Sequence, residues 1–320
     1  MTYAQYGTIA ATDFNTLVGT NPNTTSGTLN TVWSTGGTNA GYGQTAVATV
    51  ATGQTVAATG QWADLVTNTA KAATHQGTSI TSVTAPVSGG TITYLSAIPT
   101  NLTTIYTSRG NAATTSGTAS GSSGTSATPW SQYLLYQFTA TFANGDAARY
   151  FFNSGGQLKL TCSHSNSTAG INLLFNNLAS NVGTVVISSP TSGAVTIAGT
   201  SYNGVTKVGG GGNAPTLLPN NGYYALTTSN ANIFTQLAST GPSGYLSSFI
   251  RVIAKSNGTQ GTNGDAGSII TVYVLWDEVP DGLTVGSGST CALNAWKPET
   301  TNLANSWGAI SVTGGVSSSL

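Results

Sequence analysis

The stretch YLLYQFTATFANGDAARYFFNSGGQLKLTCSHS, residues 133–165, decides the fold class of this chain. It opens with apolar side chains at every second position: Leu134, Tyr136, Phe138, Ala140 and Phe142. This two-residue period is typical of a strand with one buried face, and the phrases ANGD and NSGG that follow are typical of tight turns. We therefore predict a three-stranded antiparallel meander, with residues 147–152 and 157–165 as its second and third strands. Gly155 and Gly156 are expected to give the second turn its positive φ.

Two further segments extend the predicted sheet. YLSSFIRVIAK (245–255) and IITVYVLWDEVP (269–280) have the composition of strong strands and are joined by a polar hairpin loop. The second segment is apolar on both faces, which is typical of a central strand. We therefore predict a chain that is mostly β with a helical N-terminal region. Residues 130–320 are expected to form an antiparallel β-sandwich of jelly-roll type.

The first third of the chain has a helical period instead. In GTLNTVWSTGG, GQWADLVTNTAKAATHQG and YLSAIPTNLTTIYTSRG, apolar residues recur three and four positions apart, so each segment predicts a helix with one apolar face. The partner of each face is either another helix of the chain or a neighbouring subunit. We assign residues 1–110 to a helical, loop-rich docking or oligomerisation region. Residues 111–129 are almost pure Gly, Ser, Thr and Ala and are expected to be a linker.

Charge is scarce throughout the chain. Of 320 residues, 8 are Lys or Arg and 8 are Asp or Glu, so the formal net charge is zero. Nucleic acids and anionic membranes both need a basic surface, so neither is expected as a partner. The longest apolar run, Ile269–Trp276, is too short to cross a bilayer. A surface with so little charge protects poorly against self-association, which suits a protein that works inside an assembly.

The cysteine content indicates a reducing compartment. The two cysteines, Cys162 and Cys291, are too few for a disulfide framework, and the start MTYAQYGTIA lacks the pattern of a secretory signal. We therefore expect the chain to be made and folded in a reducing cytoplasm. Whether Cys162 and Cys291 pair with each other stays open at this point.

Residues suited to catalysis are few. Asp277 and Glu278 are the best pair of carboxylates, but adjacent side chains on a strand diverge, so we expect a solvated strand end rather than a sugar-cleaving cleft. His75 and His164 are the two imidazoles, and neither has the companions that a zinc site needs. We predict no catalytic site, no metal site and no cofactor. An enzyme that uses Asp277 or Glu278 is the weaker alternative.

Six residues are candidates for contacts with other subunits. Arg149 and Lys159 flank the NSGG turn and are expected to pin a sheet face or to bridge subunits. Trp33 and Trp62 lie on apolar helical faces, where a core or an interface is the default for an aromatic side chain. Trp296 and Trp307, in NAWKPETTNLANSWG, follow no period, so we expect them to be surface anchors on a partner.

The phrase ARYFFN-x-GG at residues 148–156 resembles a family of tailed-bacteriophage virion structural proteins, commonly called tail fibre or minor structural proteins. Support comes from GTLNTVWSTGGTNAGYGQT, GQWADLV…ATHQGTS and NGYYALT…GSIITVYVLWDEVPDG, so the resemblance extends from about Tyr6 to about Trp307. It implies a virion component and brings no catalytic motif with it. It does not distinguish tail fibre, neck, baseplate or head.

Resemblance and composition together predict a non-enzymatic structural component of the virion, assembled in the host bacterial cytoplasm and associated with the tail. Its expected partners are copies of itself, with a trimer as one option, and other virion proteins. Two alternatives stay open: a head decoration or cement protein, and a module that binds host surface glycans through aromatic, Asn and Asp side chains.

Overall fold

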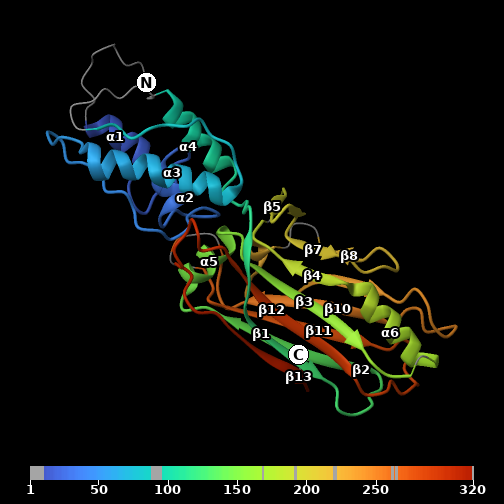
Figure 1. Cartoon of the computed structure of the whole chain (residues 1–320). Helices are drawn as coiled ribbons and strands as arrows, with labels where there is room; N and C mark the ends of the chain where they lie inside the picture. Colours follow the sequence, from blue (N-terminus) through green and yellow to red (C-terminus); the bar gives the residue numbers. More distant parts are fainter. Residues whose placement is uncertain are drawn as a thin grey trace.

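The computed structural model describes residues 11–87, 96–167, 169–190, 193–218, 222–260, 263 and 266–318. Figure 1 shows a helical region at one end of the molecule and a β-sandwich at the other, with helix α5 (Gly145–Asn153) where the two meet. Residues 1–10, which contain the start of the resemblance and of the predicted docking region, lie outside the described residues.

Within the described residues, the N-terminal region is built from four α-helices and a π-helical turn: α1 (Ala11–Val18), α2 (Leu29–Trp33), η1 (Ala58–Trp62), α3 (Ala63–Gln76) and α4 (Ala97–Thr107). Their apolar faces meet in one core, in which Phe14, Leu29, Leu65 and Leu102 are fully buried. The helical faces are therefore partnered by one another within the chain. The prediction of a helical N-terminal region is confirmed.

Where the structure describes the chain, the β-sandwich consists of two antiparallel sheets. The first sheet has the order β1 (Thr115–Thr125), β12 (Ser289–Pro298), β3 (Gln157–His164), β4 (Thr184–Ile187) and β7 (Val205–Val208). The second has the order β13 (Ser311–Ser317), β2 (Tyr133–Thr141), β11 (Ile269–Asp277), β10 (Phe249–Ser256), β9 (Ala231–Leu237) and β8 (Thr216–Leu217). A short hairpin of β5 (Val195–Ile197) and β6 (Thr200–Tyr202) and the 3-10 turn η2 (Tyr223–Ala225) complete it. The prediction of a mostly β chain with an antiparallel β-sandwich is confirmed.

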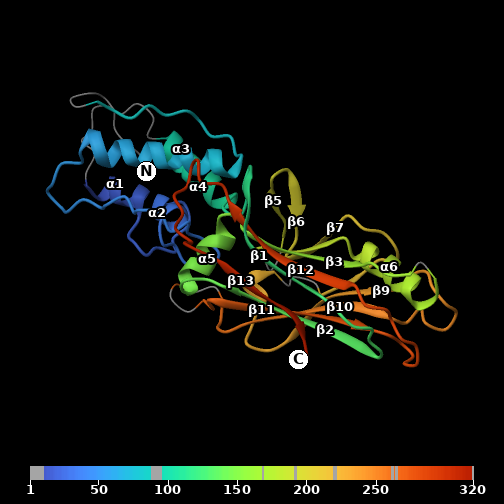
Figure 2. The ribbon, with the colours of Figure 1, turned by 60° about the horizontal axis from the view of Figure 1, so that its bottom comes forward.

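Residues that alternate along the strands fill the space between the sheets. Tyr136 and Phe138 of β2 and Val274 and Trp276 of β11 are fully buried there. Strand β11 lies between β2 and β10, as its two apolar faces predict. Helix α6 (Gly170–Val182) runs along the side of the sandwich, against β3, β9 and β10, and its apolar face joins the same core (Figure 2).

The segment 145–153 is helix α5, so the prediction of a strand there is wrong. Asn144 is the N-cap, and its side chain accepts a hydrogen bond from the Ala147 backbone N–H at 2.8 Å. Four side chains on one face of the helix are buried: Ala147, Ala148, Phe151 and Phe152. The Asn-Gly pair thus starts a helix instead of turning a hairpin. As a result β2 and β3 lie in different sheets, and the predicted meander does not form.

Residues 115–125, inside the predicted linker, form strand β1 instead of a flexible connection. Strand β1 pairs with β12 and lies against β13, where the two sheets meet at one edge. There Ser120 Oγ accepts from the Val312 backbone N–H at 2.9 Å, and Ser122 Oγ donates to the Gly314 carbonyl oxygen at 2.8 Å. Small side chains allow this close approach of two backbones, which is why a Gly/Ser/Thr composition suits a strand at this edge.

Candidate functional site

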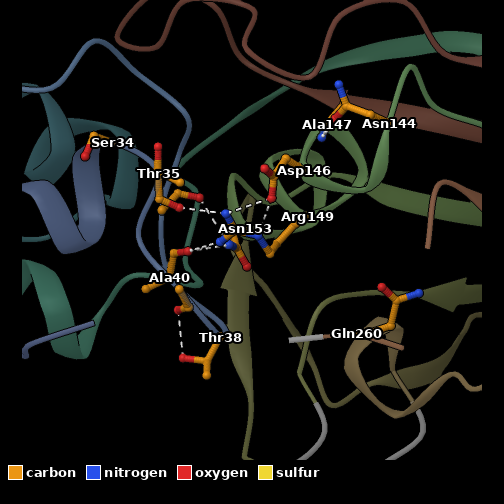
Figure 3. Close-up of polar contacts among 12 residues, drawn as sticks. Ser34, Thr35, Thr38, Ala40, Asn144, Asp146, Ala147, Arg149, Asn153 and Gln260 are labelled. Carbon is orange, nitrogen blue, oxygen red and sulfur yellow. Dashed lines mark hydrogen bonds and ion pairs between the residues drawn. The ribbon is translucent and has the colours of Figure 1, made fainter. Parts of the chain in front are cut away.

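The joint between the helical region and the sandwich contains a fully buried cation, Arg149 of α5. Its Nη1 donates to the Ala40 carbonyl oxygen at 2.8 Å and its Nη2 to the Thr35 carbonyl oxygen at 2.7 Å, both in the loop after α2. Its Nε and Nη2 also donate to Asp146 Oδ1, at 3.2 and 3.1 Å (Figure 3). A buried charge is tolerated when it is paired and hydrogen-bonded, and one carboxylate and two carbonyls meet that need here.

Asn153 lies one turn further along α5 and binds the same loop. Its Nδ2 donates to the carbonyl oxygens of Ala40 and Gly41, at 3.0 and 3.1 Å. Its Oδ1 lies 2.6 Å from the Tyr224 hydroxyl, which is also 2.8 Å from the Thr38 carbonyl oxygen, so one hydroxyl hydrogen serves two acceptors. Burial raises the pKa of Tyr224, so this hydroxyl remains a donor.

We call this set of groups the clamp; it comprises the side chains of Arg149, Asn153 and Tyr224 and the backbone carbonyls of Thr35, Thr38, Ala40 and Gly41. The phrase ARYFFN supplies two of the three donors, and the phrase STGGTNAGYG supplies the acceptors. The carbonyl groups of a loop need hydrogen-bond donors when they leave water, and here three side chains supply them. The clamp therefore fixes the loop after α2 on α5 and sets how the helical region sits on the sandwich.

A second connection runs through the segment that follows β12. Leu303 of this segment is buried in the helical core, whereas Trp307 is buried in the core of the sandwich. The Gln44 side chain exchanges two hydrogen bonds with the backbone of Ala304, at 2.9 and 2.8 Å. The chain thus returns to the helical region before it enters β13, and the joint is held from two sides.

His75 and Glu299 form a buried pair in this second connection, with 2.9 Å between His75 Nδ1 and Glu299 Oε1. The other carboxylate oxygen accepts hydrogen bonds from the backbone N–H groups of Thr301 and Asn302. Burial by itself raises the pKa of Glu299. The hydrogen bonds from His75, Asn302 and Thr301 outweigh burial and lower that pKa from 4.5 to about 2.

Acid is therefore expected to weaken the joint at Glu299. Because its pKa is lower in the folded chain than in the unfolded chain, this carboxylate contributes stability above pH 4.5, and the contribution is lost as the pH falls from 4.5 towards 2. Glu299→Gln should lower the free energy of unfolding at neutral pH, and the gap to the wild type should narrow with acid. Urea titrations of both chains between about pH 6 and about pH 3 measure this gap. A difference in free energy of unfolding that stays constant over that pH range contradicts a lowered pKa of Glu299 in the folded chain.

Four of the six residues predicted to contact other subunits are buried inside the chain. Trp33 and Trp62 belong to the helical core, Arg149 to the clamp and Trp307 to the sandwich core. The prediction of Trp307 as a surface anchor is therefore wrong. Its segment crosses from one core to the other, and a crossing loop has no period that would indicate its burial.

Lys159 and Trp296 remain partly exposed on the neighbouring strands β3 and β12. The Lys159 Nζ lies 3.7 Å from the centre of the Trp296 ring, and partial burial lowers the pKa of this ammonium group. Both residues occupy strand positions that alternate with core positions, so they face away from the core. Both side chains are exposed enough to meet a partner, and their contact with one stays a prediction.

Asp277 and Glu278 diverge, but Glu278 does not reach solvent. Glu278 is fully buried, and its Oε1 accepts from the Leu283 backbone N–H at 2.7 Å. Asp277 is partly exposed, and burial together with the nearby Asp281 raises its pKa. The expectation of a solvated strand end is therefore wrong for Glu278. The two carboxylates do not converge on a shared cleft of the kind that sugar cleavage requires.

His164 is held by polar neighbours on the core side of β3. Its Nδ1 lies 3.0 Å from Ser289 Oγ and its Nε2 lies 3.2 Å from Asn172 Oδ1, and burial lowers its pKa. In the part of the chain that the structure describes, no three His, Cys, Asp or Glu side chains are grouped closely enough to hold a metal ion.

Two members of the clamp, Asn153 and Tyr224, are absent from the residues predicted from the sequence. Arg149 and Asn153 are four positions apart, which places them on one face of a helix. This spacing is the sequence feature that indicates a shared helical face, but AARYFF also fits a short strand, so the spacing alone does not decide between the two. Tyr224 gives no local signal, since its hydroxyl partners are 71 and 186 positions away in the sequence.

No protein-family model matches this chain, and no curated protein or solved structure is significantly similar to it. Among the described residues, no helix combines the length and apolarity needed to span a bilayer.

Proposed function

We propose that this chain is a non-enzymatic structural component of a bacteriophage virion, associated with the tail as part of a fibre, neck or baseplate. The clamp carries this proposal. The most specific phrase of the resemblance, ARYFFN-x-GG, directs its one charged side chain, Arg149, to backbone carbonyls of the same chain. A motif used in this way maintains a fixed shape rather than acting on a substrate, and a fixed shape is what a subunit of a particle needs.

Within the particle, we propose that copies of the chain pack through the outer face of the six-stranded sheet. At one end of this face the apolar side chains of Tyr133 and Leu237 are exposed. Beside them lies a small apolar cluster, Leu135, Ile253, Tyr273 and Leu275, most of which the chain already buries. Lys255 and Asp277 lie at opposite ends of the β10–β11 pair on the same face. A second copy turned by a half rotation would bring these unlike charges together, as self-complementary interfaces do.

The two alternatives to a tail protein are a module that binds host glycans and a head decoration protein. Glycan binding needs exposed aromatic platforms. Trp307 is buried and the Lys159 ammonium group lies over the ring of Trp296, which leaves Tyr133 as an exposed aromatic ring. A head decoration protein needs the same fixed shape and packing faces as a tail protein. The shape of the chain therefore fits both positions, and only its location in the particle distinguishes a head protein from a tail protein.

Quantitative mass spectrometry of gradient-purified particles tests the proposal. We expect peptides of this chain in the particles at a fixed multiple copy number relative to the major capsid protein. They should persist after a high-salt wash, because apolar packing is not screened by salt in the way that surface charges are. Detection of the chain in lysates of infected cells, together with its absence from purified particles, contradicts the proposal.

A further inference from the structure

The two cysteines, distant in sequence, lie directly opposite each other in the sandwich. Cys162 of β3 and Cys291 of β12 are register partners in an antiparallel pair, and their Sγ atoms are 3.3 Å apart. Directly opposite Cα atoms in such a pair are about 4.5 or 5.5 Å apart. Disulfides span Cα separations of about 4.4 to 6.8 Å. The backbone therefore already satisfies the requirement for a bond between the two sulfurs.

The two thiols differ in their access to solvent. Cys291 is fully buried and accepts a hydrogen bond from Trp276 Nε1 at 3.2 Å, and burial raises the pKa of its thiol. Cys162 is partly exposed, at the end of β3 that leads to the loop after His164. An oxidant from solution can therefore reach Cys162 first, and Cys291 is placed to resolve the product.

We propose that Cys162 and Cys291 form a disulfide once the chain meets an oxidant, and that this bond locks β3 to β12. With hydrogen peroxide, the Cys162 thiolate attacks one peroxide oxygen, giving a sulfenic acid and releasing water after protonation. The Cys291 sulfur then attacks the Cys162 sulfur, the S–O bond breaks and a second water leaves. Two thiols are oxidised to one disulfide while one peroxide is reduced to two waters, so electrons and protons balance.

The bond would close a large loop of the sandwich. The two cysteines are 129 positions apart, and the enclosed segment contains α6 and all strands from β4 to β11. A cross-link over so long a loop removes much conformational freedom from the unfolded chain. The timing of the lock rests on the proposed function: a subunit that folds in a reducing cytoplasm and leaves the cell at lysis would gain the bond after assembly.

The test uses the full chain, purified in reductant and then treated with hydrogen peroxide after the reductant is removed. We expect the intact mass to fall by two hydrogen atoms and a disulfide-linked peptide pair containing Cys162 and Cys291 to appear. The oxidised chain should melt about 5 to 10 °C above the reduced chain. Cys162→Ser, a change at the partly exposed position, should show neither the mass loss nor the rise in melting temperature.

Two thiols that are both alkylated by iodoacetamide in the unfolded chain after peroxide treatment would overturn the inference. So would cross-linked dimers of the chain in place of the internal bond. Failure of the disulfide proposal and failure of the proposed function give different results. If the chain is found in particles with both thiols free, the disulfide proposal fails and the proposed function stands. If the internal disulfide forms but the chain is absent from particles, the proposed function fails and the disulfide proposal stands.

Discussion

Arg149→Met is expected to lower the free energy of unfolding by about 3 to 5 kcal/mol, because it removes one partner of a buried, charged hydrogen-bond network. The change deprives the Thr35 and Ala40 carbonyls of charged donors and removes the ion pair with Asp146, while the methionine keeps much of the apolar stem. Urea titrations followed by tryptophan fluorescence and by circular dichroism measure the loss.

A matched control for this variant is Arg109→Met. Arg109 also contacts the loop after α2, but it does so through the exposed Asn39. Exposed hydrogen bonds and charge pairs contribute little, so this variant should lose no more than about 1 kcal/mol. Equal losses in the two variants, or a loss below about 1 kcal/mol for Arg149→Met, would show that the clamp does not hold the two regions together.

Gly156→Val is expected to reduce stability by about 3 kcal/mol or more, and to leave much of the chain insoluble when it is expressed. A Cβ at this position would lie 2.6 Å from the Phe151 carbonyl oxygen and 2.7 Å from the Phe151 ring. Phe151 is fully buried between α5 and the core, so it has little room to move. The yield of soluble protein and the urea midpoint measure the effect.

Gly211→Val is the control for this substitution. Gly211 also has an ordinary φ, and the nearest atom to a Cβ there is the side-chain Oδ1 of Asn181 at 3.2 Å. A flexible side chain at an exposed position can shift, so stability should stay within about 0.5 kcal/mol of the wild type. If both valine variants behave alike, close approach to Phe151 is not the reason for glycine at position 156.

The same turn shows what its sequence could and could not predict. Gly155 has a φ of 86°, as predicted, but Gly156 does not have a positive φ. Glycine is required at position 156 because a neighbouring backbone and ring approach it closely. The sequence pattern predicts glycines in this turn. Whether a glycine is needed for its positive φ or for close packing depends on the neighbouring atoms, which the sequence does not show.

Strands β2, β10 and β11 could be predicted because alternation of apolar residues is a local property of each segment. Strand β1 could not, because its residues are small and polar. It forms a strand only because β12 and β13 supply hydrogen-bond partners. Composition alone made the same residues resemble a linker.

The clamp could not be predicted from the sequence because its partners are far apart along the chain. Arg149 donates to carbonyls that lie 109 and 114 positions earlier in the chain. No local period indicates such a contact, and an arginine beside a turn has the same appearance whether it is solvated or buried. A strand at 147–152, as the sequence predicts, also excludes a common face for Arg149 and Asn153, which only the helix provides.

Immunogold labelling of intact virions, with an antibody raised against the full chain and read by electron microscopy, locates the chain in the particle. We expect gold on the tail, at the fibres, neck or baseplate, in most particles. Gold over the head would contradict the tail assignment and favour a decoration or cement protein. Particles without gold, from a lysate in which the antibody detects the chain, would contradict the claim that it is a structural component of the virion.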